Sequence, residues 1–92
     1  MKRYLIELPH SNEECLRALD ETRLTSKELL PMIDWGCNVG YHSGFVVLEA
    51  ATEADARGRI QSDFLKDKAR VTEVSRFTAE EIESLHKVAV TS

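Results

Sequence analysis

One short segment limits the folds open to this chain, because Gly44-Phe45-Val46-Val47-Leu48 carries no charged or strongly polar side chain. A strand that is apolar on both faces belongs in the middle of a sheet, with cover above and below it. The chain has 92 residues, which is enough for one domain and no more. We therefore expect residues 1–92 to form a single domain built around a sheet in which 44–48 is a central strand.

The segments on either side alternate between strand and helix patterns. A period of two in the apolar residues predicts three further strands, over residues 2–8, 33–37 and 70–77. A Ser or Thr followed three residues later by an acidic residue is the spacing of a capping box, and it predicts three helix starts, at Ser11, Thr52 and Thr78.

The apolar residues of each helix indicate which side faces the sheet. In the first two helices we expect inward stripes of Cys15, Leu16 and Leu19, and of Ala56, Ile60 and Phe64. The last helix has the stripe Ile82, Leu85 and His86. We interpret this histidine as a packing or interface residue without a ligand role.

The resulting order β-α-β-β-α-β, with an additional C-terminal helix, predicts an α+β ferredoxin-like domain with a four-stranded antiparallel sheet. Right-handed connections place strands 2–8 and 44–48 in the centre and both helices on one face. The other face then has no cover except the short terminal helix. Because a bare apolar face of that size is an association surface, the pattern predicts a homodimer.

Charge and composition narrow the class of partner. The chain has 12 Lys and Arg against 16 Asp and Glu, a net charge of -4, which argues against a nucleic-acid-binding protein. No segment approaches the roughly 20 apolar residues of a membrane span, so we expect no membrane partner and a cytoplasmic location. The two cysteines, Cys15 and Cys37, are interpreted as reduced thiols.

The predicted topology gathers polar residues at one end of the sheet. The end of strand 2–8, the start of the first helix and the turn before strand 44–48 all meet there, which brings together His10, Cys37, Asn38, Tyr41 and His42. The simplest interpretation is a polar hairpin in which Cys37 is a small buried residue. Three chemical interpretations compete with it.

The first is general acid-base catalysis by His42, His10 and Glu7 on a small organic substrate. Glu7 lies on a central strand, where its carboxylate has a raised pKa, is solvated at the rim of the barrel, or pairs with a basic residue of a neighbouring strand. The ligand-binding candidates are Trp35, Tyr41, Cys37 and Arg70. The last of these belongs to a basic run from Arg57 to Arg70 that would attract an anionic ligand.

The other two interpretations depend on sulfur and imidazole groups. His10, Cys37 and His42 offer nitrogen and sulfur donors for zinc or a similar transition metal, although no two of them have a recognised ligand spacing. Cys37 and His42 are also candidates for a thiolate-imidazole pair, which needs a third, orienting group. The sequence itself predicts no cofactor.

Several short motifs resemble those of a known superfamily. They are Trp35-Gly36-Cys37, Gly40-Tyr41-His42-Ser43-Gly44-Phe45, Phe64-Leu65 and Arg70-Val71. With this layout they resemble the dimeric α/β-barrel superfamily, and within it small bacterial proteins distantly similar to muconolactone isomerase. The resemblance implies a ferredoxin-like protomer, two sheets paired into a barrel, and a cavity for a small molecule.

Two classes of function therefore stand beside the metal interpretation. One is a barrel protein that binds a small organic or anionic molecule, with isomerase-like acid-base chemistry. The alternative is a non-enzymatic interaction or accessory module whose sheet face serves assembly. Fold alone does not decide between them, and the sequence leaves open whether the protein is an enzyme.

Overall fold

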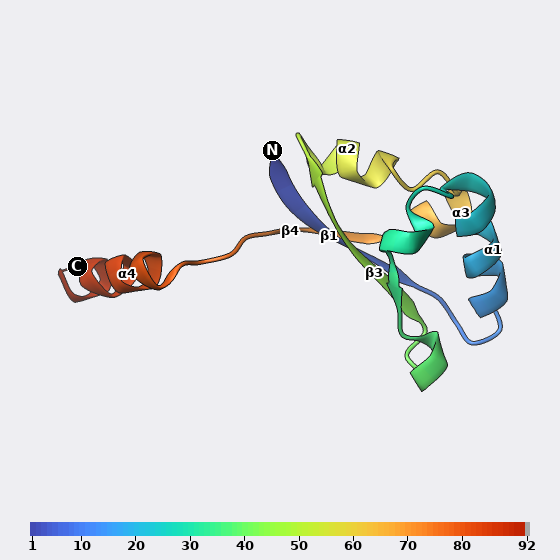
Figure 1. The fold of residues 1–92 in the computed structure, drawn as a ribbon, viewed down its shortest axis with the longest axis horizontal. Helices are drawn as coiled ribbons and strands as arrows, with labels where there is room; N and C mark the ends of the chain where they lie inside the picture. Colours follow the sequence, from blue (N-terminus) through green and yellow to red (C-terminus); the bar gives the residue numbers. More distant parts are fainter. Residues whose placement is uncertain (92) are drawn as a thin grey trace.

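The computed structural model describes residues 1–91, with side chains described as far as Lys87. The chain has an α+β architecture in which a four-stranded antiparallel sheet has the order β2-β3-β1-β4, an arrangement compatible with the expected ferredoxin-like fold (Figure 1). The strands are β1 (Lys2–Pro9), β2 (Asp34–Trp35), β3 (Ser43–Ala50) and β4 (Arg70–Val74). The helices are α1 (Cys15–Thr25), α2 (Glu53–Gly58), α3 (Asp63–Lys66) and α4 (Ala79–Thr91).

The two long strands, β1 and β3, occupy the centre of the sheet, as the sequence predicted. Their register pairs Tyr4 with Leu48 and Ile6 with Val46. All four of these side chains are buried. Because successive residues of a strand point to opposite faces, the even-numbered positions of β1 define an inner, buried face.

Helix α2 lies on that inner side of the sheet, followed by α3, and α1 packs beside α3 at one end of the sheet (Figure 1). The buried core joins the inner face to Ala56 of α2, Ile60 in the following loop and Leu65 of α3. Phe64 is half-buried and packs against this core. No helix in the described part of the chain is both long and apolar enough to cross a membrane.

The first helix faces the sheet with a different stripe from the one expected. Leu16 points outward and is 71% exposed, whereas Ala18 and Thr22 are buried. Cys15 and Leu19 are half-buried. The inward positions therefore follow the helical spacing i, i+3, i+4 and i+7 from Cys15, and the prediction for Leu16 was wrong.

Three predicted boundaries also change. The strand expected over 33–37 is only Asp34–Trp35, because Cys37–Val39 forms a 3₁₀ turn. The strand expected over 70–77 ends at Val74. The single helix expected after Thr52 divides into α2 and α3, because the Gln61 amide at the break donates to Ser26 Oγ in a neighbouring loop.

The helix starts follow the predicted capping residues. At Ser11 and Thr78 the hydroxyl accepts a hydrogen bond from the backbone amide of the glutamate three positions on, and the carboxylate of that glutamate accepts one from the backbone amide of the Ser or Thr. The Thr52 hydroxyl accepts from the Asp55 amide. Helices α2 and α4 begin directly after Thr52 and Thr78, as predicted. Helix α1 begins only at Cys15, one turn after the Ser11 capping box, with Glu14 as its N-cap residue.

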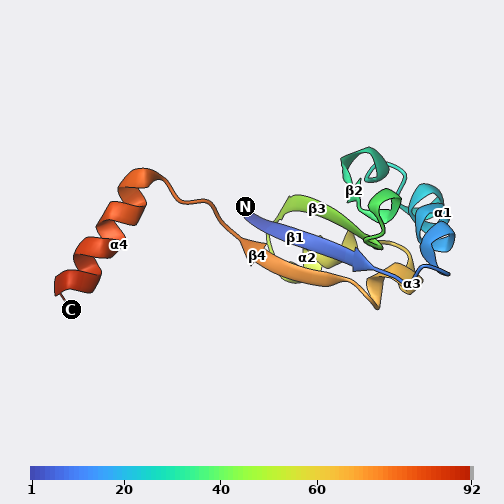
Figure 2. The ribbon, with the colours of Figure 1, turned by 90° about the horizontal axis from the view of Figure 1, so that it is seen from below.

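The C-terminal helix projects away from the sheet and the other helices (Figures 1 and 2). The radius of gyration is 16.6 Å, whereas a compact domain of this length has about 12 Å. Ile82, Leu85 and His86 are exposed, so the expected packing of α4 against its own sheet is absent from the described residues. An interface role for this stripe stays a prediction.

The outer face of the sheet contains the odd-numbered positions of β1 and β3. It carries Leu5, Phe45 and Val47, and Val47 is 41% exposed. The two-sided cover expected for strand 44–48 is therefore not provided by the helices that the structure describes. Apolar surface remains on this face.

Gly44 lies at a point where β2 and β3 are closely packed. A Cβ atom there would lie 2.9 Å from two Trp35 ring carbons and 3.0 Å from Ile33 Cγ2. We expect Gly44→Ala to destabilise the fold by about 1–3 kcal/mol, because these neighbours must shift. Urea denaturation should show a lower midpoint with an unchanged slope.

Gly58→Ala is the matched control for this substitution. A Cβ atom at Gly58 would have no neighbour within 4 Å. Because Gly58 lies in a helix, alanine there should be neutral or stabilising by about 0.5–1 kcal/mol. Equal losses in both variants would show that the contact with Trp35 is not the cause.

Candidate metal centre

Four segments of the chain meet at one end of the sheet and bring together two histidines and two cysteines. His10 follows β1, Cys15 begins α1, Cys37 begins the 3₁₀ turn after β2, and His42 precedes β3. One ligand atom from each of these residues lies within 4.8 Å of the other three. All four residues are half-buried. We call this set the metal centre.

The pairing of β1 with β3 places the two histidines. The last paired residues of the two strands are Pro9 and Ser43. The His10 amide then donates to the His42 carbonyl at 3.1 Å, which extends the pairing by one residue. The two imidazole rings consequently lie 5.8 Å apart between centroids.

A tight turn places Cys37. The Gly36 amide donates to the Ser43 carbonyl, and the Tyr41 amide donates to the Gly36 carbonyl. Gly40 has φ of 86°, a left-handed conformation that glycine adopts without steric cost. These contacts hold the Cys37 side chain beside His10.

The hydrogen bonds of His10 define what its ring can do. Its Nδ1 lies 3.1 Å from the Leu8 carbonyl, which only accepts, so we assign the ring proton to Nδ1. Nε2 therefore carries a lone pair, and it lies 3.4 Å from Cys37 Sγ. A backbone carbonyl that orients the far nitrogen is the usual environment of a metal-binding histidine.

The distances in the cluster suit a tetrahedral ion. Zinc with Zn–S bonds of about 2.3 Å and Zn–N bonds of about 2.05 Å separates its ligand atoms by about 3.3–3.8 Å. The 3.4 Å between His10 Nε2 and Cys37 Sγ already lies in this interval. Because no pair exceeds 4.8 Å, a contraction of about 1.5 Å or less completes the tetrahedron.

The surroundings of Cys37 favour its neutral thiol. Burial, and then the neighbouring Cys15 thiol, raise the pKa of Cys37 above its ordinary value. Among the side chains that the structure describes, the His42 Nδ1 is buried and has no hydrogen-bond partner. A divalent cation would compensate both features, because it binds thiolates and imidazole lone pairs directly.

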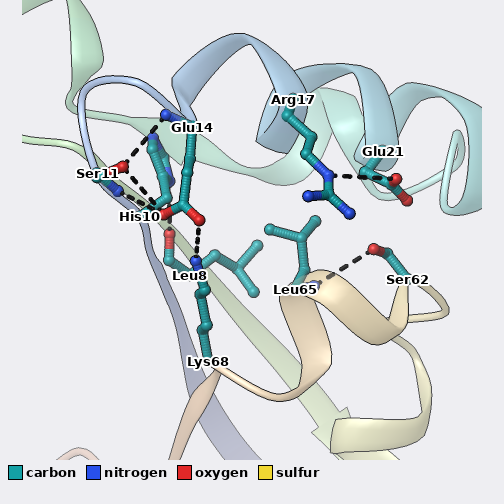
Figure 3. A network of polar contacts seen from close by, with 9 residues as sticks. All are labelled: Leu8, His10, Ser11, Glu14, Arg17, Glu21, Ser62, Leu65 and Lys68. Carbon is teal, nitrogen blue, oxygen red and sulfur yellow. Dashed lines mark hydrogen bonds and ion pairs between the residues drawn. The ribbon is translucent and has the colours of Figure 1, made fainter.

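An ion pair anchors the loop that carries the centre. Lys68, before β4, donates to Glu14 at 2.5 Å, and Glu14 also accepts from the Ser11 amide and hydroxyl (Figure 3). The hydrogen bond from Lys68, followed by those from Ser11, lowers the pKa of Glu14 to about 2. The residue next to Cys15 is thus tied to the segment between α3 and β4.

The structure separates the remaining site candidates into two groups. Trp35 lies near the metal centre, with its ring centroid 6.1 Å from that of His10. Glu7 and Arg70 are register partners on the outer face of the sheet. Tyr41 is 61% exposed and its ring lies 5.7 Å from that of Phe45, which also faces outward. Glu7, Arg70 and Tyr41 therefore do not join His10, Cys37 and His42.

Two members of the basic run have structural partners. Arg57 donates to the carbonyls of Lys66 and Ala69, and thereby closes the segment that contains α3. Lys68 forms the ion pair with Glu14 and also lies over the Phe64 ring, 4.4 Å from its centroid. These two cations serve contacts within the protein.

Cys15 is the member of the metal centre that the sequence interpretation assigned to the helix stripe. The signal that identifies it is a repeated spacing: four residues separate His10 from Cys15, and four separate Cys37 from His42. Each half therefore contributes one imidazole and one thiol from a short loop. The ligands of structural zinc sites commonly come in short-spaced pairs of two cysteines or two histidines, whereas each pair here combines one of each.

Comparisons of the chain with known protein families, with characterised proteins and with solved structures find no match. The assignment of function therefore depends on the geometry of the metal centre and on the surfaces around it.

The Glu14 anchor gives a pH-dependent prediction for the metal-free protein. The Glu14 pKa is about 2 in the fold against an ordinary value of 4.5. The unfolded chain thus binds more protons between these values, and stability is lost as the pH falls through this window. Glu14→Gln should be less stable than the parent above pH 4.5, and the difference should vanish toward pH 2, as measured by urea denaturation with chelator present.

Glu13→Gln is the control for this prediction, because Glu13 is an exposed carboxylate beside the same helix start. It should follow the parent across the pH range. A difference between Glu14→Gln and the parent that does not change between pH 5 and pH 2 would contradict the role of the Lys68 ion pair.

Proposed function

We propose that the protein binds one zinc ion per chain through His10, Cys15, Cys37 and His42. The observation that carries this proposal is the approach of four ligand atoms, from four separate segments, to within 4.8 Å of one another. Two thiolates and two imidazoles are a frequent ligand set of structural zinc sites. The soft thiolate and imidazole ligands favour zinc over magnesium or calcium.

The number of protein ligands indicates the role of the ion. Catalytic zinc sites keep one position open for water or substrate, whereas structural sites are filled by four protein ligands. Here four side chains complete the tetrahedron. We therefore assign the ion to fixing the loop after β1 against the turn before β3, and not to catalysis.

The thiolate-imidazole interpretation receives less support from the same geometry. The structure pairs Cys37 with His10 rather than with His42, and the Leu8 carbonyl is the orienting group. A catalytic cysteine must be ionised in every turnover and so needs a lowered pKa, whereas burial raises the pKa of Cys37. A thiolate at Cys37 would form only when a neighbouring base such as His10 takes the proton. Reduced thiols at the metal centre also fit the cytoplasmic location included in this proposal.

Zinc binding should be visible as stabilisation. At a free zinc concentration about a thousand times Kd, binding stabilises the fold by roughly 4 kcal/mol, which raises the Tm of a domain of this size by about 15 °C or more. We expect one equivalent of zinc per chain by titration calorimetry, with displacement by a strong chelator.

Variants of the ligands distinguish this site from adventitious binding. Cys15→Ser or His42→Ala should weaken zinc binding roughly 100-fold and remove about 2.7 kcal/mol of the stabilisation. His86→Ala is the control, because this histidine is exposed on α4, far from the metal centre (Figure 1). Equal stabilisation of all variants by zinc, or none of the parent, would overturn the proposal.

A second candidate function is binding of a small organic molecule at the same end of the sheet, with His10 and His42 as acid and base. Two buried ring nitrogens without a hydrogen-bond partner among the described residues, Trp35 Nε1 and His42 Nδ1, favour it. A thermal-shift screen of small carboxylic and aromatic acids on the metal-free protein tests this candidate. If Glu7→Gln abolished the stabilisation by such an acid, this candidate function would be contradicted, because Glu7 faces the other side of the sheet.

We further propose that two copies pair through the outer face of the sheet, as a dimeric α/β barrel would require. The accessible surface is 6376 Å², about 1,000 Å² more than the roughly 5,400 Å² of a typical folded chain of this mass. A standard interface buries about 800 Å² per partner. The projecting α4 adds to the accessible surface, and the outer face offers the partly exposed apolar residues Leu5, Phe45 and Val47 for pairing.

The mass in solution tests the dimer. Analytical ultracentrifugation at micromolar concentration should give twice the chain mass of 10.4 kDa. Val47→Asp places a charge in the outer face and should yield the monomer. Leu24→Asp, at an exposed position of α1, should leave the dimer intact. A parent protein that sediments as a single chain would disprove the pairing.

A further inference from the structure

The two sulfur atoms of the metal centre lie close enough for a different reaction. Cys15 Sγ and Cys37 Sγ are within 4.8 Å of each other, and both residues are free thiols with partial exposure. A disulfide has an S–S length of about 2.05 Å, so the sulfurs must approach by less than about 3 Å. Rotation of one cysteine side chain between staggered positions moves its sulfur by roughly 3 Å.

We propose that Cys15 and Cys37 form a reversible disulfide when the protein meets a hydroperoxide, and that this bond excludes zinc from the metal centre. This inference rests on the zinc function proposed above, and it adds control of that site by oxidation. Both sulfurs are used in the bond, so only His10 and His42 remain as ligands. Two imidazoles do not hold zinc with the strength of a four-ligand set.

The reaction consumes two thiols and one hydroperoxide, which together account for all its atoms and electrons. The Cys37 thiol gives its proton to His10 Nε2, 3.4 Å away, and its sulfur attacks one peroxide oxygen. The O–O bond breaks, and the leaving oxygen takes that proton. Cys15 then attacks the sulfenic sulfur of Cys37, the S–S bond forms, and the S–O oxygen leaves with the Cys15 proton. For hydrogen peroxide, the two thiols lose two hydrogens and the oxidant becomes two waters.

The position of the pair favours the bond over further oxidation. A sulfenic acid with a resolving thiol nearby is captured as a disulfide before it reaches the sulfinic state. Cys37 begins a short turn bounded by Gly36 and Gly40, and Cys15 is the first residue of α1. Neither sulfur lies in the interior of a helix or strand, so the bond need not break a backbone ladder.

The test uses the full chain, reduced and freed of metal, and treated with one equivalent of hydrogen peroxide. Thiol titration should show the loss of both thiols, and intact-mass measurement should show the loss of two hydrogens. Zinc affinity should fall roughly 100-fold or more. A dithiol reductant should restore both thiols and the binding.

The outcomes separate this inference from the zinc proposal. If the reduced protein binds zinc and peroxide leaves both thiols free, or converts them to sulfinic acids, the disulfide is disproved and the zinc site stands. If the oxidised protein still binds zinc with full affinity, the exclusion is disproved. If the reduced protein binds no zinc but forms the disulfide, the zinc function is overturned and control of the site falls with it.

Cys15→Ser and Cys37→Ser provide the matched comparison. Each keeps one thiol and so cannot form the internal bond, and its peroxide product should be a sulfenic acid or a linked pair of chains on a non-reducing gel. A monomeric product of the parent with no free thiols, beside these products of the variants, supports the internal bond. Parent chains linked to one another would overturn it.

Discussion

The hydrogen bond from the His10 amide to the His42 carbonyl sets the geometry on which the metal centre depends. It continues the β1–β3 pairing beyond the last paired residues, so the two histidines lie side by side on adjacent strands. A strand register is fixed by the buried face, because a slip of one residue would turn every inward side chain outward. Burial of Ile6 and Leu8 therefore also determines where the histidines lie.

Much of the fold follows from local patterns, and the part that does not has a physical reason. The alternation in β1 and the capping boxes at Ser11 and Thr78 are local, and the structure confirms them. Which face of α1 is buried is not determined by the local sequence, because it depends on how the helix packs against α3 and the sheet. Leu16 was therefore assigned to the wrong side, although Cys15 was assigned correctly to the inward side.

The candidate metal centre could also be predicted only in part. The topology predicted from the sequence already places His10, Cys37 and His42 at one end of the sheet, because strand ends and turns must meet there. The orientation of Cys37 was not predictable, since a 3₁₀ turn replaces the expected strand at that position. Cys15 was interpreted as a core residue and so was missed as a fourth candidate ligand, because a half-buried thiol fits a helix stripe as well as it fits a metal site.

A cross-link at the metal centre would compensate for a feature of the whole chain. Helix α4 lies outside the body of the domain, so the core is built from about 75 residues, a size at which a hydrophobic core alone gives marginal stability. A link between Cys15 and Cys37 closes a loop of just over 20 residues, which stabilises the fold by about 3 kcal/mol in the chain-entropy description.

The proposed zinc ion and the proposed disulfide would each provide that link, because each would connect the same two sulfurs. The domain therefore need not unfold when one replaces the other. Oxidation would change the charge and the chemistry at this end of the sheet while the β1–β3 pairing is retained. A site controlled by oxidation requires this combination, in which the chemistry of the site changes and the fold does not. A partner can then distinguish two folded forms of the same chain.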